Sequence, residues 1–292
     1  MAAMLKVISD TKEHQNKNMK KELINVIPIL ADVFEEKLVE FLPKILSILS
    51  QRIREDDPQL NSACAEAIGA MVSLSLKGLP TRNLTEKLVG IFNTFLKLLP
   101  TSGKYSQIGA VMCITKIAQT SPVQCILRIC DDMVQKLIEV MNSNSCKARL
   151  QIMEALLNTI LAIEENTEKL QQNCEVIIPI VIEGFEDPDW NVRKLSIEMI
   201  HTFNDLVPDM LELHKAPVLE ALKRLRFDKV LYKLCKNSFQ VHCNQIKAVR
   251  DATKAALKAI DGGIEGEEEQ QQSFQRRLEE YEETATKTSK IK

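Results

Sequence analysis

One sequence pattern returns six times along this chain, and it constrains the fold more than any other feature. The pattern is a short polar turn followed by an amphipathic helix, as in "DPDWNVRKLSIEMIHTF" at 187–203. We take Val192 as the marker of that copy. The equivalent markers in the other copies are Met19, Leu60, Ser106, Ala148 and Val249. Successive markers lie 41, 46, 42, 44 and 57 residues apart, so the chain is predicted to be a tandem array.

The spacing of the markers indicates helical hairpins of the HEAT or armadillo-like type, whose repeats span about 40 to 47 residues. In each copy one helix precedes the marker helix, and both carry apolar residues at helical spacing. A single hairpin cannot bury its own apolar stripe, whereas stacked hairpins bury a continuous core. We therefore expect an all-α solenoid of about six hairpins. Its intra-hairpin edge holds the loops inside the hairpins, and its inter-hairpin edge holds the loops that join successive hairpins.

Composition agrees with a helical chain and narrows the classes of partner. Aromatic residues make up 4% of the sequence, and there are 9 glycines among 292 residues. The 38 basic residues nearly balance the 40 acidic ones, so no overall charge attracts nucleic acid or a membrane surface. No apolar run reaches the length of a membrane span, and the first residues do not resemble a secretion leader. We expect a cytoplasmic protein whose partners are other proteins.

The last interval between markers is long because of one segment, "VLYKLCKNSFQVHCNQ" at 230–245. Without these 16 residues the interval becomes 41 residues and matches the others. The segment begins with Val, whose codons start with GT, and ends with Gln, which can be encoded by CAG. Those letters are intron boundaries, so the segment could be retained intron or alternative splice-site sequence. The alternatives are a functional insertion on the intra-hairpin edge and ordinary variation within the family. In each case a surface loop can lengthen at little entropic cost, and the flanking helices should still stack.

Four stretches together resemble one family. They are "QIGAVMCITKIAQ" (107–119), "CKARLQIMEALLNTI" (146–160), "EDPDWNVRKLSIEMI" (186–200) and "RFDK" with "IKAVRDATKAAL" (226–229 and 246–257). The combination is similar to the N-terminal HEAT domain of the plant Tortifolia/SPIRAL microtubule-associated proteins, which are related to TOG domains. The resemblance covers about residues 18–260. It implies a HEAT-repeat solenoid, which we expect over residues 1–261. The acidic composition of residues 262–292 departs from the family, whose proteins carry a basic tail, and we expect these residues to form a separate C-terminal tail.

The resemblance also implies a partner and a contact surface. TOG-type domains bind tubulin through the loops inside their hairpins, and basic loop residues suit its acidic surface. Basic residues recur here in the loops or first helical turns, although the helix dipole disfavours them at a helix N-terminus. We thus expect association with tubulin or microtubules on the cytoskeleton, without a cofactor. The candidate contact residues are Lys20, Lys21, Arg52, Arg54, Lys104, Lys147, Arg149, Trp190, Arg193, Lys194, Lys229, Lys247 and Arg250.

Several candidates have a structural alternative. The arginines at 193 and 250 could pair with the aspartate of a neighbouring turn, such as Asp187, and form a ladder that joins repeats. Trp190 could anchor a partner, as exposed aromatic residues do in interfaces, or pack across the neighbouring loop. Lys147, Lys194 and Lys247 could contact tubulin or remain solvated. The corresponding alternative for the whole protein is a general HEAT adaptor for other protein partners.

Catalytic and metal chemistry are not expected. The eight cysteines form no CxxC pair, and Cys64 and Cys113 fall on apolar helix stripes as buried, reduced thiols do. Cys235, His242 and Cys243 lack a fourth ligand for a zinc site. The "GK" of "TSGKYS" (101–106) has no upstream glycine or strand and is therefore not a phosphate-binding loop. We expect no enzyme activity.

The tail after Ile260 begins with the low-complexity acidic sequence "DGGIEGEEEQQQ". Phe274, Leu278 and Tyr281 then follow at helical spacing. This part could form a short helix for docking or self-association, or it could be a frayed end of the chain.

Overall fold

The structure is a computed structural model that describes residues 2–9, 17–34, 36–55, 57–76, 81–100, 103–226, 251–256 and 260. Within these residues all regular structure is helical. The chain divides into two compact units, residues 1–218 and 219–292. The expected all-α solenoid is confirmed, and the first unit contains its first five hairpins.

Each hairpin of the first unit consists of a leading helix and a marker helix. The pairs are α1 (Ala2–Ser9) with α2 (Lys17–Phe34), α4 (Leu42–Arg52) with α5 (Pro58–Leu76), α6 (Thr81–Leu96) with α7 (Lys104–Thr120), α8 (Val123–Met141) with α9 (Arg149–Ala162), and α10 (Thr167–Glu183) with α11 (Trp190–Leu206). Short elements connect or follow them: α3 (Glu36–Val39), the 3-10 turn η1 (Gly184–Glu186), and α12 (Pro208–Leu213). Helix α13 (Lys215–Arg226) crosses the boundary between the two units.

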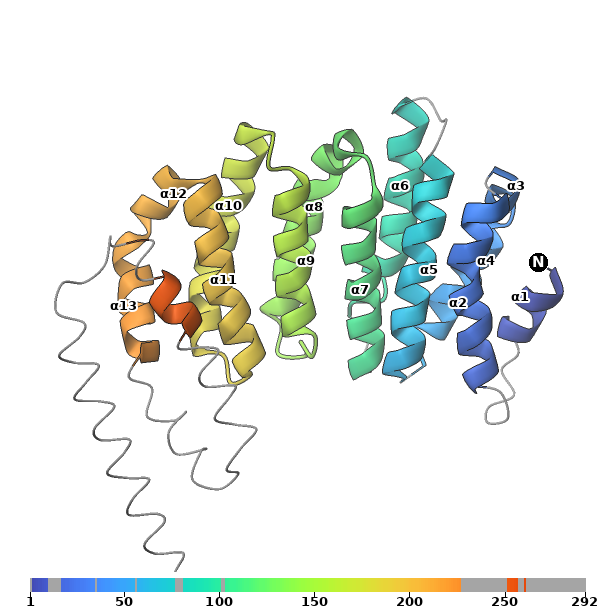
Figure 1. Cartoon of the computed structure of the whole chain (residues 1–292), viewed down its shortest axis with the longest axis horizontal. Coiled ribbons are helices and arrows are strands. Elements are labelled where there is room, and N and C mark those ends of the chain that lie inside the picture. Colours follow the sequence, from blue (N-terminus) through green and yellow to red (C-terminus); the bar gives the residue numbers. More distant parts are fainter. Residues whose placement is uncertain are drawn as a thin grey trace, which may run out of the picture. The chain divides into compact units, whose positions relative to one another are not determined.

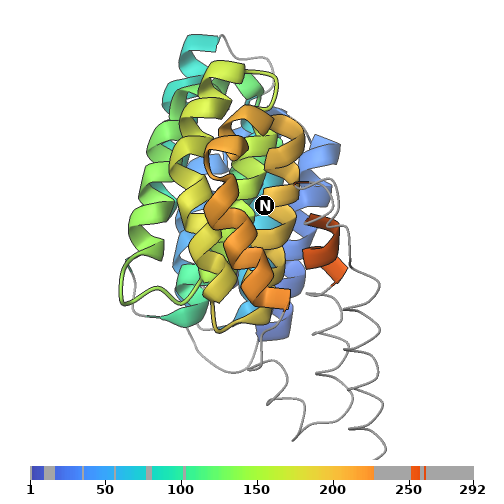
Figure 2. The ribbon, with the colours of Figure 1, turned by 90° about the vertical axis from the view of Figure 1, so that its left-hand side faces the viewer.

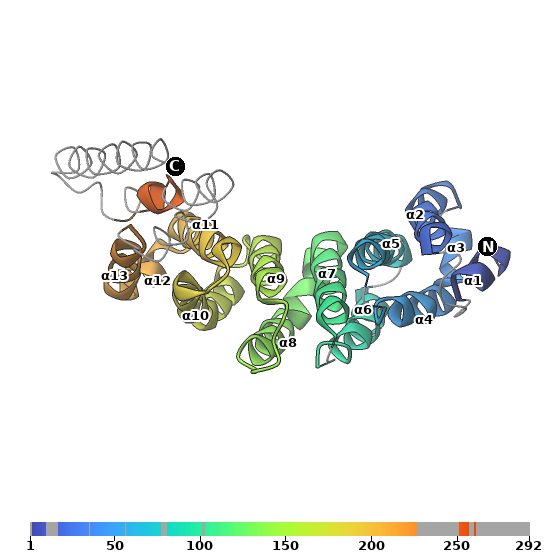
Figure 3. The ribbon, with the colours of Figure 1, turned by 90° about the horizontal axis from the view of Figure 1, so that it is seen from below.

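The hairpins of the first unit stack in chain order and form two layers. The marker helices α2, α5, α7, α9 and α11 contact one another in sequence, and the leading helices α4, α6, α8 and α10 form the second layer (Figures 1 and 3). Figure 2 shows the stack from its end. Each hairpin therefore packs mainly on its neighbours, as expected for a solenoid.

The markers have the register that the sequence predicts. Leu60, Ser106 and Val192 are each the third residue of a marker helix, and all are buried. Ala148 is buried too, although α9 begins only at the next residue. Met19 is also the third residue of its helix, but its side chain is half exposed. Met19 is more exposed than the other markers because, within the described residues, no hairpin precedes the first one.

Helices α5 and α7 approach each other closely because small residues line their contact. A Cβ atom on Gly69 would lie 3.3 Å from the Cβ of Lys116, and one on Gly109 would lie 2.8 Å from the Cγ of Asn61. Cys64 and Cys113 are fully buried, which confirms their expected place on the apolar stripes. Burial raises the pKa of both thiols far above the usual range, so they remain protonated inside the core.

Side-chain caps set the starts of several helices. A carboxylate oxygen of Asp57 accepts hydrogen bonds from the amides of Gln59 and Leu60 at 3.0 and 3.1 Å. Asp189 accepts from the amide of Asn191 at 2.9 Å. These bonds satisfy amide groups that have no partner inside the helix. Both of these helix starts lie at the connections inside the hairpins, so capping fixes the backbone of the intra-hairpin edge there.

Parts of the sequence fall outside the described residues. They include the segment 230–245, the tail 262–292, the Cys235–His242–Cys243 group, and the three candidates Lys229, Lys247 and Arg250. Among the residues that the structure does describe, no helix is long and apolar enough to cross a bilayer. Nor do three or more metal-ligating side chains gather anywhere in that part.

Candidate protein-binding edge

The intra-hairpin edge of the first unit contains the connections that follow α4, α6, α8 and α10, together with the first turns of the marker helices. These connections all lie on one side of the stack, at the bottom of Figure 1. The inter-hairpin edge lies on the opposite side. A row of loops on one edge can contact a partner at several points at once.

Polar side chains directly after the markers link successive hairpins along this edge. The Nδ2 of Asn61 donates to the carbonyl of Tyr105 at 2.6 Å, which joins the second hairpin to the third. The Oε1 of Gln107 accepts from the amide of Lys147 at 2.6 Å, which joins the third to the fourth. The Nε of Arg149 donates to Oδ2 of Asp187 at 2.5 Å, which joins the fourth to the fifth. At each of these three junctions, one bond thus fixes the position of one loop relative to the next.

Arg193 has a structural role, as one interpretation of the sequence held, but its partner differs from the expected one. Its Nη1 donates to the backbone carbonyls of Asp187 and Pro188, at 2.5 and 3.0 Å. It therefore supports the turn of its own hairpin, while the Asp187 carboxylate is bound by Arg149 of the preceding hairpin. The inter-repeat ladder exists, and at this junction its arginine is Arg149 rather than Arg193. Arg250 lies outside the described residues.

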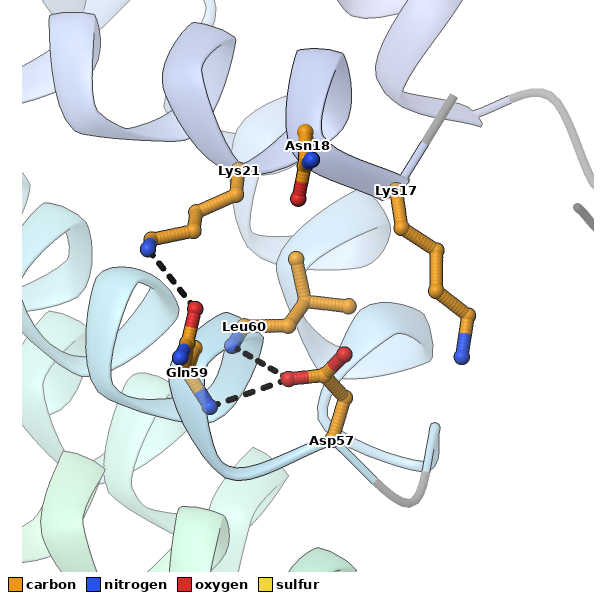
Figure 4. A pocket seen from close by; sticks show the side chains of 6 residues that line it. All are labelled: Lys17, Asn18, Lys21, Asp57, Gln59 and Leu60. Carbon is orange, nitrogen blue, oxygen red and sulfur yellow. Dashed lines mark hydrogen bonds between the residues drawn. The ribbon is translucent and has the colours of Figure 1, made fainter. Parts of the chain in front are cut away.

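The first two hairpins contain candidates that are mostly buried or bonded within the chain. Lys20 and Arg52 are each 4% exposed, and Arg52 forms an ion pair with Glu55. Lys21 lies in a small hollow between the starts of α2 and α5, where its Nζ donates to Oε1 of Gln59 at 2.9 Å. Figure 4 shows this hollow, with the side chains of Lys17 and Lys21 at its rim. Arg54 is exposed in the turn that follows α4.

The third and fourth hairpins present exposed lysines. Lys104 begins α7, and its Nζ lies 5.7 Å from the centre of the Tyr105 ring. Lys147 is exposed in the loop before α9, while its backbone amide is held by Gln107. Lys97, at the end of α6, is exposed on the same edge. Sequence reasoning selected Arg52 and Arg54 at the end of the leading helix of the second hairpin, but in the third hairpin it considered only the start of the marker helix and so missed Lys97.

The fifth hairpin differs from the first four in charge. Trp190 is half buried at the start of α11, and Lys194 pairs with Glu198 at 2.6 Å. Two acidic residues, Glu186 and Asp189, are exposed in the same turn. The basic character of the edge is therefore concentrated in the first four hairpins.

The inter-hairpin edge carries the opposite charge. Lys37 and Lys44 supply exposed positive charges at its N-terminal end. The exposed acidic residues in the connections and adjoining helix ends are Asp32, Glu40, Glu164, Glu165, Glu168, Asp205 and Asp209. Over the side chains that the structure describes, the two long edges of the first unit thus differ in the sign of their exposed charge, although the chain as a whole is nearly neutral.

A polar cluster joins the leading helices α8 and α10. Lys169 forms an ion pair with Asp131, and the Nδ2 of Asn173 donates to the other Asp131 oxygen at 3.0 Å. Burial raises the pKa of the adjacent Cys130 thiol to about 11. Such a thiol is almost entirely protonated at neutral pH and is a poor nucleophile. The cluster therefore links two hairpins and has the character of a structural contact.

Comparisons with known proteins agree with this architecture. TORTIFOLIA1-like protein 4 of Arabidopsis thaliana is 25% identical over 228 residues, which cover 77% of this chain and 34% of that protein. Microtubule-associated protein TORTIFOLIA1 of the same plant is 20% identical over 219 residues, which cover 73% and 24%. The chain therefore spans about a third or less of the length of these two relatives.

A solved structure and a family model extend the comparison. The structure of Kap121p bound to Pho4p is similar to 89% of this chain and 24% of that one, with a TM-score of 0.53 and 12% identity, which supports the solenoid fold alone. The family model described as TORTIFOLIA1 N-terminal matches residues 1–262. Family and fold are those of a repeat scaffold and not of a known enzyme class. Since the match spans most of the sequence, the chain belongs to the TORTIFOLIA1 N-terminal family.

Proposed function

We propose that this chain is a microtubule-associated repeat protein of the cytoplasm that binds tubulin through its intra-hairpin edge. Membership of the TORTIFOLIA1 N-terminal family supports the proposal, because one relative is named a microtubule-associated protein. The solenoid supports it as well, since stacked repeats offer an extended surface to a protein partner. The binding partner is tubulin, as free dimer or as polymer.

The observation that carries the proposal is the difference in charge between the two edges. Exposed basic residues lie on the intra-hairpin edge of the first four hairpins, and exposed acidic residues lie on the inter-hairpin edge. The surface of tubulin is strongly acidic, so it attracts the first edge and repels the second. Overall charge could not give this preference, because the chain is nearly neutral.

The exposed basic residues of the intra-hairpin edge make the contact with tubulin. Arg54, Lys104 and Lys147 come from three successive hairpins, and Lys97 adds a fourth charge in the same hairpin as Lys104. Lys21 and Arg149 contribute less, because each is already bonded to a neighbouring hairpin. The candidates Lys20, Arg52 and Arg193 are buried, and the two arginines support their own turns through bonds to Glu55 and to the backbone carbonyls of Asp187 and Pro188.

The test is co-sedimentation of the purified chain with stabilised microtubules at low and physiological salt. A triple variant with Arg54, Lys104 and Lys147 changed to Glu should bind at least about tenfold more weakly, because complementary charges govern encounter and register. A matched control changes Lys37, Lys44 and Arg128 to Glu. These exposed residues lie away from the intra-hairpin edge and give the same change in net charge.

The expected result is loss of binding in the first triple variant, near-normal binding in the control, and weaker binding of the unchanged chain as salt rises. Equal loss in both variants would show that only net charge matters, and the proposed edge would be wrong. If the unchanged chain does not sediment with microtubules and does not bind tubulin dimers, the alternative of a general adaptor for other protein partners gains support.

A further inference from the structure

Helix α2 has apolar side chains on two faces. Ile24, Ile27 and Ala31 are buried against the rest of the first unit. On another face, four large apolar residues follow at spacings of seven, three and four residues and form an exposed stripe. The exposed fractions along this α2 stripe are 50% for Met19, 37% for Val26, 61% for Ile29 and 68% for Val33.

The same positions in the next marker helices face the preceding hairpin. Lys116 and Thr120 of α7 stand ten and fourteen residues after the marker. Lys116 forms an ion pair with Glu66 of α5. The side chains of Lys116 and Thr120 both lie beside Gly69 of α5. In α9 the residue ten after the marker is Asn158, which accepts a hydrogen bond from Gln119 of α7 at 2.9 Å.

The equivalent positions in α2 are Ile29 and Val33, the two most exposed residues of the stripe. The α2 stripe is thus the surface that stacks on a neighbour elsewhere in the array, and here it lies at the end of the marker layer (Figure 3). In α2 this surface is apolar and exposed, whereas the same surface of α7 and α9 contacts the preceding hairpin.

Charge and spacing along α2 make the stripe complementary to itself when it is reversed. Val26 stands midway between Met19 and Val33, so an antiparallel partner places each Met19 opposite a Val33. The exposed charges of α2 are Lys17 at its start, Glu22 in its second turn and Asp32 near its end, whereas Lys20 is buried and Lys21 is bonded to Gln59. Antiparallel pairing brings Lys17 of one copy toward the end of α2 that carries Asp32 in the other, and it opposes the helix dipoles.

We propose that two copies of this chain associate through their α2 stripes, antiparallel and about a two-fold axis near Val26. Such an interface is isologous, because the same surface serves both copies. It buries Met19, Val26, Ile29 and Val33 from each copy, and removal of these apolar groups from water drives the association.

The geometry has a consequence for binding that rests on the proposed function. Helix α2 begins at the intra-hairpin edge and ends at the inter-hairpin edge. Reversing it in the second copy turns the two basic edges in opposite directions. The dimer therefore presents one microtubule-binding edge on each side and bridges two microtubules, whereas the monomer binds one.

Sedimentation velocity over a range of concentrations tests the dimer without microtubules. The unchanged chain should shift from its monomer mass of 33.1 kDa to twice that mass as concentration rises. Ile29→Glu should weaken association at least about tenfold, because the charge would be buried in the apolar interface. The control Val176→Glu changes an apolar residue of α10 that is 45% exposed and lies outside the stripe, and it should leave association unchanged.

Cysteine cross-linking tests the orientation. Val26→Cys should form a disulfide between copies, because the two side chains meet near the axis. Met19→Cys alone should not, because in the antiparallel pair its copies are separated by about 21 Å, the rise of fourteen helical residues. A mixture of Met19→Cys and Val33→Cys chains should cross-link. Linked peptides identified by mass spectrometry exclude bonds to the native cysteines.

A chain that stays monomeric up to about 100 μM, well above the affinity range of specific complexes, would overturn the proposal. Cross-linking of Met19→Cys with itself would overturn the antiparallel arrangement. Microtubule bundling seen by electron microscopy separates this proposal from the proposed function. Ile29→Glu should still sediment with microtubules but should no longer bundle them, whereas failure of the proposed function would abolish sedimentation and leave the dimer intact.

Discussion

Arg149 in the fourth hairpin binds the carboxylate of Asp187 in the fifth, with Nε 2.5 Å from Oδ2. The Asp187 side chain is 2% exposed and that of Arg149 is 37% exposed, so a buried negative charge is neutralised by a partly solvated positive one. The other oxygen of Asp187 accepts from the amide of Asp189 at 2.8 Å. One carboxylate therefore organises the fifth turn and joins it to the preceding hairpin.

We predict that Arg149→Ala lowers stability by about 1–3 kcal/mol, because it leaves a buried carboxylate without its ionic partner. The loss should appear in urea unfolding followed by circular dichroism. Arg54→Ala, which removes an exposed arginine from the same edge, is the control and should change stability by less than about 0.5 kcal/mol. Equal effects of the two changes would contradict the role given to the Arg149–Asp187 pair.

Two glycines in helices should respond to alanine in opposite ways. At Gly109 a Cβ atom would meet Asn61 at 2.8 Å and push its side chain away from the Tyr105 carbonyl. Gly109→Ala should therefore destabilise the chain by about 1–3 kcal/mol. At Gly90 a Cβ would meet nothing within 4 Å, so Gly90→Ala should stabilise by about 0.5–1 kcal/mol through helix propensity. Thermal unfolding of both variants gives the comparison, and a stabilising Gly109→Ala would refute the close packing at Asn61.

Asp131 should contribute to loss of stability in acid. Partial burial alone would raise the pKa of this carboxyl group, but hydrogen bonds from Lys169 and Asn173 outweigh burial and hold the pKa below its usual value. A depressed pKa stabilises the fold above the unfolded value of 3.8, and this contribution disappears as the pH falls through the folded value. Unfolding midpoints measured between about pH 6 and 3 should therefore fall more steeply for the unchanged chain than for Asp131→Asn. Parallel curves would contradict this role.

The described cysteines should differ in reactivity. Burial raises the pKa of Cys130 to about 11 and that of Cys174 to about 12, so little thiolate exists at neutral pH. Cys146 is only half buried and should be alkylated first among the described thiols. Pulse labelling with N-ethylmaleimide and peptide mass spectrometry should show labelling of Cys130 and Cys174 at least about 100-fold slower than in urea. Rapid labelling of either would show that the hairpins open easily.

Deletion of residues 230–245 should leave the thermal midpoint equal or higher, because the repeat interval then matches the others. Microtubule binding should be equal or stronger if the segment obstructs the edge, and weaker if it is a functional insertion. Transcript sequencing addresses its origin. The splice explanation fails if every transcript contains the segment and the genomic codons lack GT and AG at its ends.

The fold could be predicted from the sequence because the repeat interval and the helical spacing of the apolar residues both indicated stacked helical hairpins. Markers such as Leu60, Ser106 and Val192 proved to be the third residues of their helices, and all are buried. The exposure of Met19 could not be predicted from its own helix, because burial of that position depends on the neighbouring hairpin. In a stacked array the neighbours, and not the local pattern, decide which apolar face is covered.

The candidate edge was less predictable than the fold. Sequence position identified the loops, but it could not separate Lys20, which is 4% exposed, from the exposed Lys104. Both lie in the first turn of a marker helix, and a lysine can lay its long aliphatic stem along apolar surface. Nor could sequence show that Arg149, and not Arg193, reaches the Asp187 carboxylate, since both arginines directly follow a marker.

The opposite signs of the two edges also affect how the first unit moves before any contact forms. A body that is positive along one side and negative along the other has an electric dipole moment across its width. Near an acidic surface this moment experiences a torque, which rotates the basic edge inward during approach. The fraction of collisions that arrive correctly oriented then rises without any gain in contact energy, and added salt removes that advantage within a Debye length of about 8–10 Å.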